Sequence, residues 1–522
     1  MTDQLTLVGS VTDTAPDVLD DTARSLVAAL EVRSRDRRRD LLRARRELAR
    51  RVARGEELAQ LEETRAIRED ASWQVAPPPE DLRVRQVELA TPATADQARA
   101  AAASGADVWV ADFEDSLVPT WDRLVTGHRV VTEAVTSSTA GEGPTVVVRP
   151  RGLHLVEAHL QLDGEPVSAP VADVGLFLAG AGRALAQRGR TPSLYLPKLE
   201  SHEEAAWWDD LLTTAEEHLG LPRNTVRVSI LVETVQATYQ LEEILHVLRH
   251  RVTALAAGRW DYVFSHLRTY ATRRSHVLPD LDSFTMNTRF LRAYSDLIVR
   301  TCRYRGAQAL GGPVTEVPGG PFDDTTLRAQ ARVRRDKTRE ARQGFVGAWV
   351  LHPAQVPIAR QAFAGTAPEE DLPSGPPVVD GAALRDISGI PGTATLTGLR
   401  TNLRASLTYL TGWLAGEGTC VLDGHLHDFG TVELARLQVW QWAHHDVRVA
   451  EGPLVGELLL SRMLADEISI LRRRIGDDAR VDLAAELLED ALYAEEPPAF
   501  LSVRAYEVLL SARERVVPTS AA

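Results

Sequence analysis

The segment Gly258–Phe264 reads Gly-Arg-Trp-Asp-Tyr-Val-Phe, and the rest of the chain is organised around it. The apolar run Val252–Ala257 before it predicts a buried strand, and the residues that follow, through Leu267, have helical spacing. Asp261 therefore stands where a strand ends and a helix begins. In barrels and parallel sheets, residues at that point face the ligand-binding crevice, where N–H groups of a helix start can hold an anion. Asp261 either binds a metal beside such an anion or only caps the helix.

Apolar strand patterns alternate with helical patterns on both sides of this segment. Eight strands with helices between most of them predict an α/β fold, a (β/α)8 TIM barrel. The run Val174–Leu178 continues with helical spacing and is assigned to a helix. The eight predicted strands are Val84–Leu89, Val108–Ala111, Thr145–Val148, Leu194–Leu196, Val226–Val232, Val252–Ala257, Ala307–Leu310 and Ala348–Leu351.

Helical spacing also predicts an N-terminal helical segment, residues 1–80, before the barrel at 81–365. Residues 366–398 are predicted to be a linker, because 366–381 is rich in proline, glycine and acidic residues. A C-terminal helical domain at 399–522 follows, and we expect it to pack across the mouth of the barrel.

An arginine-rich stretch, Arg33–Arg54, carries eleven arginines and three acidic residues within the N-terminal helical segment. One interpretation is an arm that binds a polyanion. The other, which we favour, is a solvated helical face, because Leu41, Leu42, Leu48 and Val52 supply a buried stripe.

The composition is that of an ordinary soluble protein, with 44% hydrophobic and 25% charged residues. A formal net charge of −14 makes non-specific nucleic-acid binding a poor expectation. Cys302 and Cys420 match no metal or redox spacing and predict no disulfide. The N-terminal residues lack the features of a secretion signal, and no apolar run reaches the length that spans a bilayer. We therefore expect a cytoplasmic protein with no membrane partner.

Six motifs occur along the chain, and they are Ala111–Asp115, Arg149–Gly152, Leu231–Thr234, Gly258–Phe264, Trp349–Pro353 and Trp440–Trp442. In their residues and their order they resemble the motifs of the malate synthase family. The resemblance implies a Mg²⁺-dependent acyltransferase that converts the acyl group into an alkyl group on transfer. Such an enzyme condenses acetyl-CoA with glyoxylate and hydrolyses the product to malate and CoA in the glyoxylate cycle. We expect a monomer or a small homo-oligomer.

This chemistry needs a base near the methyl group of acetyl-CoA, and donors or positive charge where the enolate oxygen forms. Mg²⁺ orients the aldehyde of glyoxylate and usually takes one or two protein carboxylates. Glu233 and Asp261 follow neighbouring strands and match the family's metal ligands. The alternative for Glu233 is a helix-start acid stabilised by the helix dipole. Backbone N–H groups of Gly258, Arg259, Trp260 and Asp261 would bind the glyoxylate carboxylate, and Gly258 would permit a close approach.

Arg149 follows a predicted strand, and the resemblance makes it the catalytic guanidinium that holds the aldehyde oxygen and stabilises the enolate. The resemblance places Glu114 and Asp115 behind it, holding metal-bound waters or Arg149. Their alternative is structural ion pairing. For Arg151 we expect an outward salt bridge.

The catalytic base is expected in the C-terminal domain, where the resemblance implies Asp428. Here the sequence departs from the family, because His427 replaces the glutamate that precedes this aspartate. A histidine beside the base can shift its pKa or titrate with it, although His425 and His427 are equally consistent with exposed loop residues. The resemblance places His352 and Pro353 near the CoA channel.

The basic residues Arg334, Arg335 and Lys337 either meet CoA phosphates or, as we favour, form a solvated helical face. Other departures, at Ala254–Ala256, Thr285–Leu291 and Gly311–Pro313, change the walls around the expected site. They leave open a relative that uses another acyl-CoA or 2-oxoacid, or a malyl-CoA-type lyase or thioesterase. A third alternative is a non-catalytic barrel scaffold.

Overall fold

The structure is a computed structural model that describes residues 5–9, 14–137, 143–320, 323–370, 372–373 and 375–516. The chain divides into two compact units, each discontinuous in sequence. The first, called the barrel unit, comprises Met1–Glu47, Ala59–Gly258 and Asp296–Val379. The second, called the helical unit, comprises Leu48–Leu58, Arg259–Ser295 and Asp380–Ala522. The sequence-based segments were linear, and the chain instead passes from one unit to the other at the peptide bond between Gly258 and Arg259.

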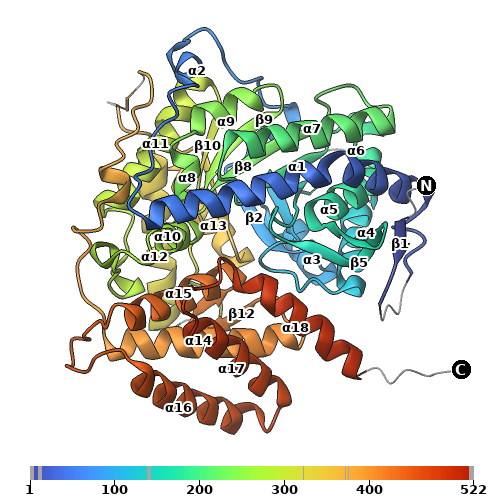
Figure 1. The fold of residues 1–522 in the computed structure, drawn as a ribbon. Helices are drawn as coiled ribbons and strands as arrows, with labels where there is room; N and C mark the ends of the chain where they lie inside the picture. Colours follow the sequence, from blue (N-terminus) through green and yellow to red (C-terminus); the bar gives the residue numbers. More distant parts are fainter. Residues whose placement is uncertain are drawn as a thin grey trace, which may run out of the picture. The chain divides into compact units, whose positions relative to one another are not determined.

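Eight parallel strands close into a barrel, which confirms the expected α/β fold (Figure 1). Their order around the barrel is β10-β11-β2-β3-β4-β7-β8-β9. All eight lie where the apolar runs predicted them, with ends that differ by up to three residues. They are β2 (Val87–Pro92), β3 (Val108–Asp112), β4 (Thr145–Arg149), β7 (Ser193–Leu196), β8 (Arg227–Val232), β9 (Val252–Ala257), β10 (Gln308–Gly311) and β11 (Gly347–Val350).

Side chains from the strands fill the barrel as a packed core. Its members include Val108, Val147, Leu231, Ala254 and Trp349. Near the amino ends of the strands the interior is polar.

The polar residue at those amino ends is Arg85, whose buried guanidinium pairs with Glu88 and donates to Tyr195, Ser229 and Thr253 at 3.1 Å. The opposite, carboxyl ends of the strands carry the candidate site.

Helices accompany the strands of the barrel unit. The helix predicted over Val174–Leu178 is present. The helices of the barrel unit are α3 (Ala95–Ser104), α4 (Trp121–Ser137), α5 (Ala169–Phe177), α6 (Arg183–Gln187), α7 (His202–Leu219), α8 (Val235–Thr238), α9 (Leu241–Val247), α12 (Asp324–Gln343) and α13 (Val356–Ala364), with α2 (Arg65–Glu69) near the N-terminus and α11 (Arg289–Arg305) spanning the division between the units.

The helix that runs from α5 through a π-turn into α6, Ala169–Gln187, is long and apolar enough to cross a membrane by length and composition, with a mean hydropathy of 1.3. The expectation that no apolar run reaches that length was therefore wrong. Since 72% of its most apolar window is buried within the folded chain, its hydrophobicity is accounted for by core packing.

Two β-hairpins were not predicted from the sequence. In the barrel unit, β5 (Val156–Leu162) and β6 (Glu165–Ser168) pair antiparallel, and β5 also pairs with β1 (Leu5–Leu7). In the helical unit, β12 (Cys420–Leu422) pairs with β13 (His425–His427).

Both hairpins turn on Asp-Gly pairs with positive φ. Asp163 and Gly164 have φ of 57° and 80°, and Asp423 and Gly424 have 51° and 81°. An Asp-Gly pair between short strands is the sequence signal that identifies such turns.

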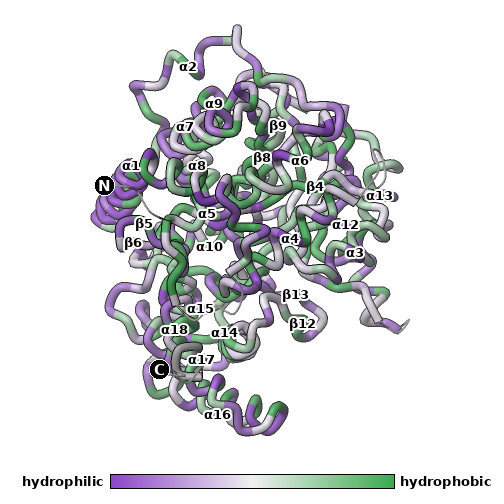
Figure 2. The backbone as a smooth tube through the Cα atoms, turned by 90° about the vertical axis from the view of Figure 1, so that its right-hand side faces the viewer, coloured by the Kyte–Doolittle hydropathy of each residue, from purple (hydrophilic) through white to green (hydrophobic). Residues whose placement is uncertain are grey.

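Helix α1 (Asp21–Ala53) contains nearly all of the arginine-rich stretch and is coloured strongly hydrophilic in Figure 2. Several of its arginines are paired rather than simply solvated. Arg45 binds Glu204 at 2.5 Å, Arg37 pairs with Asp210, and Arg39 pairs with Glu165. The buried guanidinium of Arg38 donates to the Leu153 carbonyl at 2.7 Å. This face of α1 therefore attaches the helix to the rest of the barrel unit, and the solvated-face interpretation was incomplete.

The helical unit holds five long helices near the C-terminus, coloured orange to red in Figure 1. They confirm the predicted C-terminal helices. They are α14 (Leu396–Leu414), α15 (Phe429–His444), α16 (Glu457–Ile475), α17 (Ala479–Leu492) and α18 (Leu501–Val516). The same unit includes α10 (Arg259–Thr269), which packs against α15. Of the predicted linker, residues 371 and 374 lie outside the described residues, and Ala383–Arg385 forms a short 3-10 helix.

Candidate active site

Charged side chains gather at the carboxyl ends of the four neighbouring barrel strands β3, β4, β7 and β8. Asp112 ends β3, and Glu114 and Asp115 follow it. Arg149 ends β4, and Glu233 directly follows β8. Because the strands are parallel and adjacent, their carboxyl ends share one edge of the barrel. The structure therefore brings together four of the predicted site residues, Glu114, Asp115, Arg149 and Glu233, within the barrel unit.

Arg149 is held by three carboxylates. Its Nε and Nη2 donate to the two oxygens of Asp112 at 2.6 and 2.7 Å, which is a bidentate pair. Its Nη1 lies 3.0 Å from Asp115 and 3.2 Å from Glu114. Burial opposes the charge of the guanidinium, but these carboxylates raise its pKa well above the ordinary value. Arg149 is therefore a permanently charged donor, and the sequence-based expectation that Glu114 and Asp115 hold it agrees with these contacts.

Lys198 joins the same cluster, and sequence reasoning missed it. It follows β7 within the segment Leu196-Pro197-Lys198-Leu199-Glu200. Its Nζ lies 3.0 Å from Glu114 and 3.2 Å from Asp115, and its backbone N–H donates to Glu233 Oε1 at 2.6 Å. Its φ is +51°, in the left-handed region that non-glycine residues rarely adopt. A lysine directly after a barrel strand was the signal that would have identified it.

The two neighbouring carboxylates of this cluster respond differently to their surroundings. Burial, and then the charge of Asp115, raise the pKa of Glu114 well above its ordinary value. Burial also acts on Asp115, but Lys198 and Arg149 outweigh it and lower the pKa of that carboxyl. Asp115 is therefore the ionised partner of both cations, and Glu114 is the member of the pair that more readily holds a proton.

Gly258 lies against Glu233 and has no room for a side chain. A Cβ built at Gly258 would stand 2.6 Å from Glu233 Cβ and 3.0 Å from its Oε2. The Gly258 N–H donates to the Val232 carbonyl at 3.2 Å. We expected Gly258 to permit the close approach of a substrate carboxylate. In the structure, the side chain that leaves no space for a Cβ at this position is that of Glu233.

Asp261 and Asp428 both belong to the helical unit. Asp261 is the third residue of α10, so it lies in the first helical turn and does not cap the helix. Asp428 is the N-cap of α15, and its Oδ1 accepts the Thr431 N–H at 3.1 Å. Both carboxylates flank Gly430, whose built Cβ would lie 3.2 Å from Asp261 Oδ2 and 3.5 Å from Asp428 Oδ1. The structure therefore brings the candidate metal ligand and the candidate base together.

Arg259 and Trp260, the two residues before Asp261, open helix α10. The Arg259 guanidinium lies over the Trp260 ring, 4.8 Å from its centroid. This cation–π contact fixes the two side chains against each other at the helix start, where the backbone N–H groups are the donors that a helix cannot satisfy internally.

His427 ends the β12–β13 hairpin, opposite Cys420. Burial, with a smaller contribution from His425, lowers its pKa to about 4. It is therefore a neutral imidazole near neutral pH, and it lies half-buried in strand β13 and not in an exposed loop. Burial also raises the pKa of the Cys420 thiol to about 11, so this cysteine is a poor nucleophile.

His352 and Pro353, predicted near the CoA channel, form a local helix start. His352 caps a short 3-10 helix, Pro353–Gln355, and its Nδ1 accepts the Ala354 N–H at 3.2 Å.

Lys337 is not on a solvated face, because it is buried against Glu340 at 3.0 Å and donates to the Gly312 carbonyl. Arg151 is also buried, against Asp173 and Glu157 at 2.7 and 2.9 Å, so its expected salt bridges exist but are not outward.

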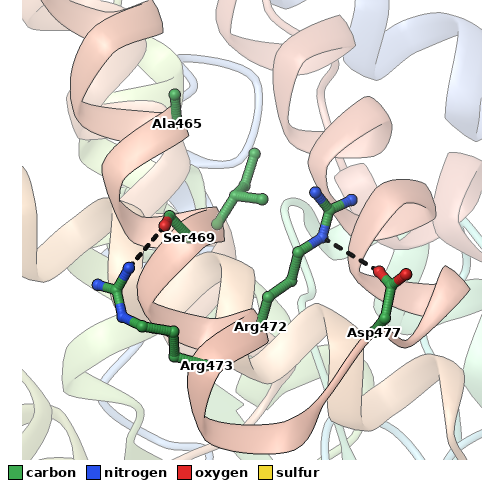
Figure 3. Close-up of a pocket in the computed structure, with 6 residues that line it drawn as sticks. Ala465, Ser469, Arg472, Arg473 and Asp477 are labelled. Carbon is green, nitrogen blue, oxygen red and sulfur yellow. Dashed lines mark hydrogen bonds and ion pairs between the residues drawn. The ribbon is translucent and has the colours of Figure 1, made fainter.

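A surface hollow in the helical unit is lined by none of these predicted residues (Figure 3). Arg473 donates to Ser469 at 2.7 Å there, and Arg472 pairs with Asp477 at 3.8 Å. The residues that line the hollow are Ala465, Ile468, Ser469, Arg472, Arg473 and Asp477.

Across the part of the chain that the structure describes, no three His, Cys, Asp or Glu side chains are grouped as a metal-binding set. A closed parallel barrel with buried carboxylates and a charged guanidinium at the carboxyl ends of its strands is the arrangement of an α/β-barrel enzyme.

Comparison with known proteins identifies the family. The family description "Malate synthase, TIM barrel domain" matches residues 145–372, and "Malate synthase, C-terminal" matches residues 393–509. The chain is 38% identical to the malate synthase of Streptomyces clavuligerus, over 94% of this chain and 96% of that protein. It is 37% identical to the malate synthase of Myxococcus xanthus, over 95% of each chain. The chain belongs to the malate synthase family, a family of acyltransferases.

Among solved structures, the chain aligns with Haloferax volcanii malate synthase in a pyruvate/acetyl-CoA ternary complex. The TM-score is 0.48 and the identity 17%, over 78% of this chain and all of that one.

Proposed function

We propose that this chain condenses acetyl-CoA with glyoxylate and hydrolyses the thioester product to malate and CoA. The observation that carries the proposal is the continuous set of contacts from Arg149 through Asp115 and Lys198 to Glu233. It joins a permanently charged donor at the end of β4 to a carboxylate that directly follows β8. Membership of the malate synthase family supports the same reaction.

Glu233 and Asp261 would hold the divalent metal. The donor set fits, since Mg²⁺ prefers carboxylate oxygens and fills its other positions with water and substrate. Glu233 packs on Gly258, and Asp261 is the third residue after Gly258, so the Cα atoms of Gly258 and Asp261 lie within roughly 11 Å of each other. When bound, Mg²⁺ would polarise the aldehyde and offset the charge that develops on its oxygen.

Asp428 would accept the proton from the methyl group of acetyl-CoA. The resulting enolate attacks the aldehyde carbon of glyoxylate, which forms the new carbon–carbon bond and leaves an alkoxide on the aldehyde oxygen. A proton from water then converts this alkoxide into the hydroxyl of a malyl thioester. Arg149 would donate to the oxygen that gains negative charge during this step. Water then cleaves the carbon–sulfur bond, which gives malate and the free thiol of CoA.

The test is an assay of the purified protein with acetyl-CoA, glyoxylate and Mg²⁺, in which a thiol-reactive dye follows free CoA. We expect thiol release that depends on both substrates and stops when EDTA removes the metal. If no thiol is released from acetyl-CoA and glyoxylate at a Mg²⁺ concentration that saturates the protein, the proposed reaction is refuted.

Two changes to the assay separate the alternatives. Propionyl-CoA and pyruvate, each replacing one substrate, test for another acyl-CoA or oxoacid. Mass spectrometry of the products distinguishes malate with free CoA from a malyl-CoA thioester that is not hydrolysed. Faster turnover with either replacement, or accumulation of malyl-CoA, would favour a diverged activity.

A place in the glyoxylate cycle and a cytoplasmic location belong to the same proposal, since the reaction consumes glyoxylate and a central acyl-CoA. Disruption of the gene should abolish growth on acetate while leaving growth on glucose unchanged, and the protein should fractionate with cytoplasmic markers.

A further inference from the structure

Only two of the 59 lysine and arginine residues in this chain are lysines. They are Lys198, which is 5% exposed, and Lys337, which is 0% exposed. Each lies within 3.2 Å of carboxylate oxygens. The chain uses arginine wherever a cation is exposed, and it keeps lysine at two places inside the fold. A lysine ammonium is a compact point charge that fits between buried carboxylates, whereas an arginine guanidinium is a wider, planar group that binds carboxylates through a rigid fork of donors.

Lys198 and Arg149 bind the same two acids. Asp115 Oδ2 accepts from Arg149 Nη1 at 3.0 Å and from Lys198 Nζ at 3.2 Å. Glu114 lies 3.2 Å from Arg149 and 3.0 Å from Lys198. Each of the two acids is therefore shared by two cations.

This sharing affects Arg149, because Asp112 already binds its Nε and Nη2. A guanidinium has five N–H donors, and its third face, Nη1, points to Glu114 and Asp115. The more strongly these acids bind Arg149, the less its charge is available to an oxygen of the substrate. An ammonium that binds the same Glu114 and Asp115 draws part of their attraction away from Arg149.

We propose that Lys198 is a positioning residue that keeps Arg149 available for the reaction by sharing Glu114 and Asp115 with it. This inference rests on the proposed function, in which Arg149 donates to the reacting oxygen. Lys198 acts through Arg149, and its backbone N–H separately orients Glu233. Loss of the side chain alone should therefore impair turnover and leave the binding of metal intact.

The first experiment compares Lys198→Met with Lys337→Met, its matched control at the other buried lysine. Lys198→Met should lower kcat at least 30-fold. The KM for acetyl-CoA should change less than threefold, and the calorimetric Kd for Mg²⁺ should either change less than threefold or fall. Lys337→Met should lower the melting temperature comparably and leave kcat within threefold. A kcat of Lys198→Met within threefold of wild type, or a loss of Mg²⁺ binding alongside kcat, would overturn the inference.

The second experiment restores the charge. Lys198→Gly keeps the backbone N–H and suits the positive φ, so it removes only the side chain. Added n-butylammonium should recover kcat at least tenfold with saturation, and n-butanol of similar size should not. No recovery, or equal recovery with n-butanol, would contradict the role of the charge. Wild type is assayed in parallel, and its inactivity would instead contradict the proposed function.

Discussion

Asp261 and Asp428 lie on either side of Gly430, close enough that a methyl group on that glycine would contact both carboxylates. Gly430 is the second residue of α15, directly after Phe429 at the helix start that Asp428 caps. Helix α10 carries Asp261 and packs against α15 in the same unit. The proposed metal ligand and the proposed base are thus adjacent because two helices meet at a residue without a side chain.

Gly430→Ala should displace Asp261, because its Cβ would stand 3.2 Å from Asp261 Oδ2, closer than ordinary van der Waals contact. We expect Mg²⁺ affinity to fall at least fivefold by calorimetry and kcat to fall on the order of tenfold, about 1.4 kcal/mol. Gly389→Ala in the same unit is the control, since nothing lies within 4 Å of its built Cβ. Equal Mg²⁺ affinity in both variants would show that Asp261 does not bind the metal.

Asp261→Asn and Glu233→Gln should each remove most Mg²⁺ binding and most turnover, because a neutral amide is a far weaker ligand for this ion. Calorimetry measures the affinity directly and thermal melting checks the fold. If either variant bound Mg²⁺ like the wild type, that residue would not be a ligand.

Arg149→Lys keeps a positive charge but loses the planar fork that grips both oxygens of Asp112. We expect kcat to fall about 100-fold or more, roughly 3 kcal/mol of transition-state stabilisation, with little change in the KM for acetyl-CoA. The same substitution at Arg151, buried against Asp173 and Glu157, controls for the cost of changing a buried arginine. Near-normal turnover would move the donor role to another residue.

Asp428→Asn should bind Mg²⁺ and substrates but fail to exchange the methyl protons of an acetyl-CoA analogue with solvent deuterium, as read by NMR. His427→Ala should exchange them, and its pH–rate profile above pH 5 should match the wild type, since the wild-type imidazole is already neutral there. Exchange that survives in Asp428→Asn and is lost in His427→Ala would assign the base to the histidine.

His266→Phe should reduce the loss of stability in acid. His266 is buried in α10 beside Phe290, and burial, followed by the charge of His276, lowers its pKa to about 3. Below about pH 6.5 the unfolded chain therefore binds a proton that the folded chain does not bind. The stability present above pH 6.5 is lost progressively as the pH falls toward 3.

Between pH 8 and pH 5 the wild type should lose about 2 kcal/mol more than His266→Phe through this group. Urea midpoints at the two pH values, with m-values compared, measure the difference. Parallel pH dependence in both proteins would mean that the imidazole can be protonated in the folded state.

The barrel could be predicted because each of its strands is a short apolar run, and such a run can be recognised as a buried strand from its own residues alone. Glu233 and Arg149 could be placed for the same reason, since each directly follows one of these runs, and Asp261 could be placed because it lies four residues beyond the run Val252–Ala257. The hairpin before Asp428 was missed although Asp423 and Gly424 mark its turn, because its two strands have only three residues each and are too short for a periodic pattern.

By itself the sequence determined the order of strands and helices, the family, and which charged residues end the strands, because these follow from local periodicity and motifs. Only the tertiary structure decided which charges neutralise one another. Lys198 and Glu114 are far apart in the chain and 3.0 Å apart in space, and no local pattern contains that distance. The same holds for the neutral state of His427 and the pairing of the α1 arginines, because ion pairs and burial depend on neighbours that the folded backbone brings together.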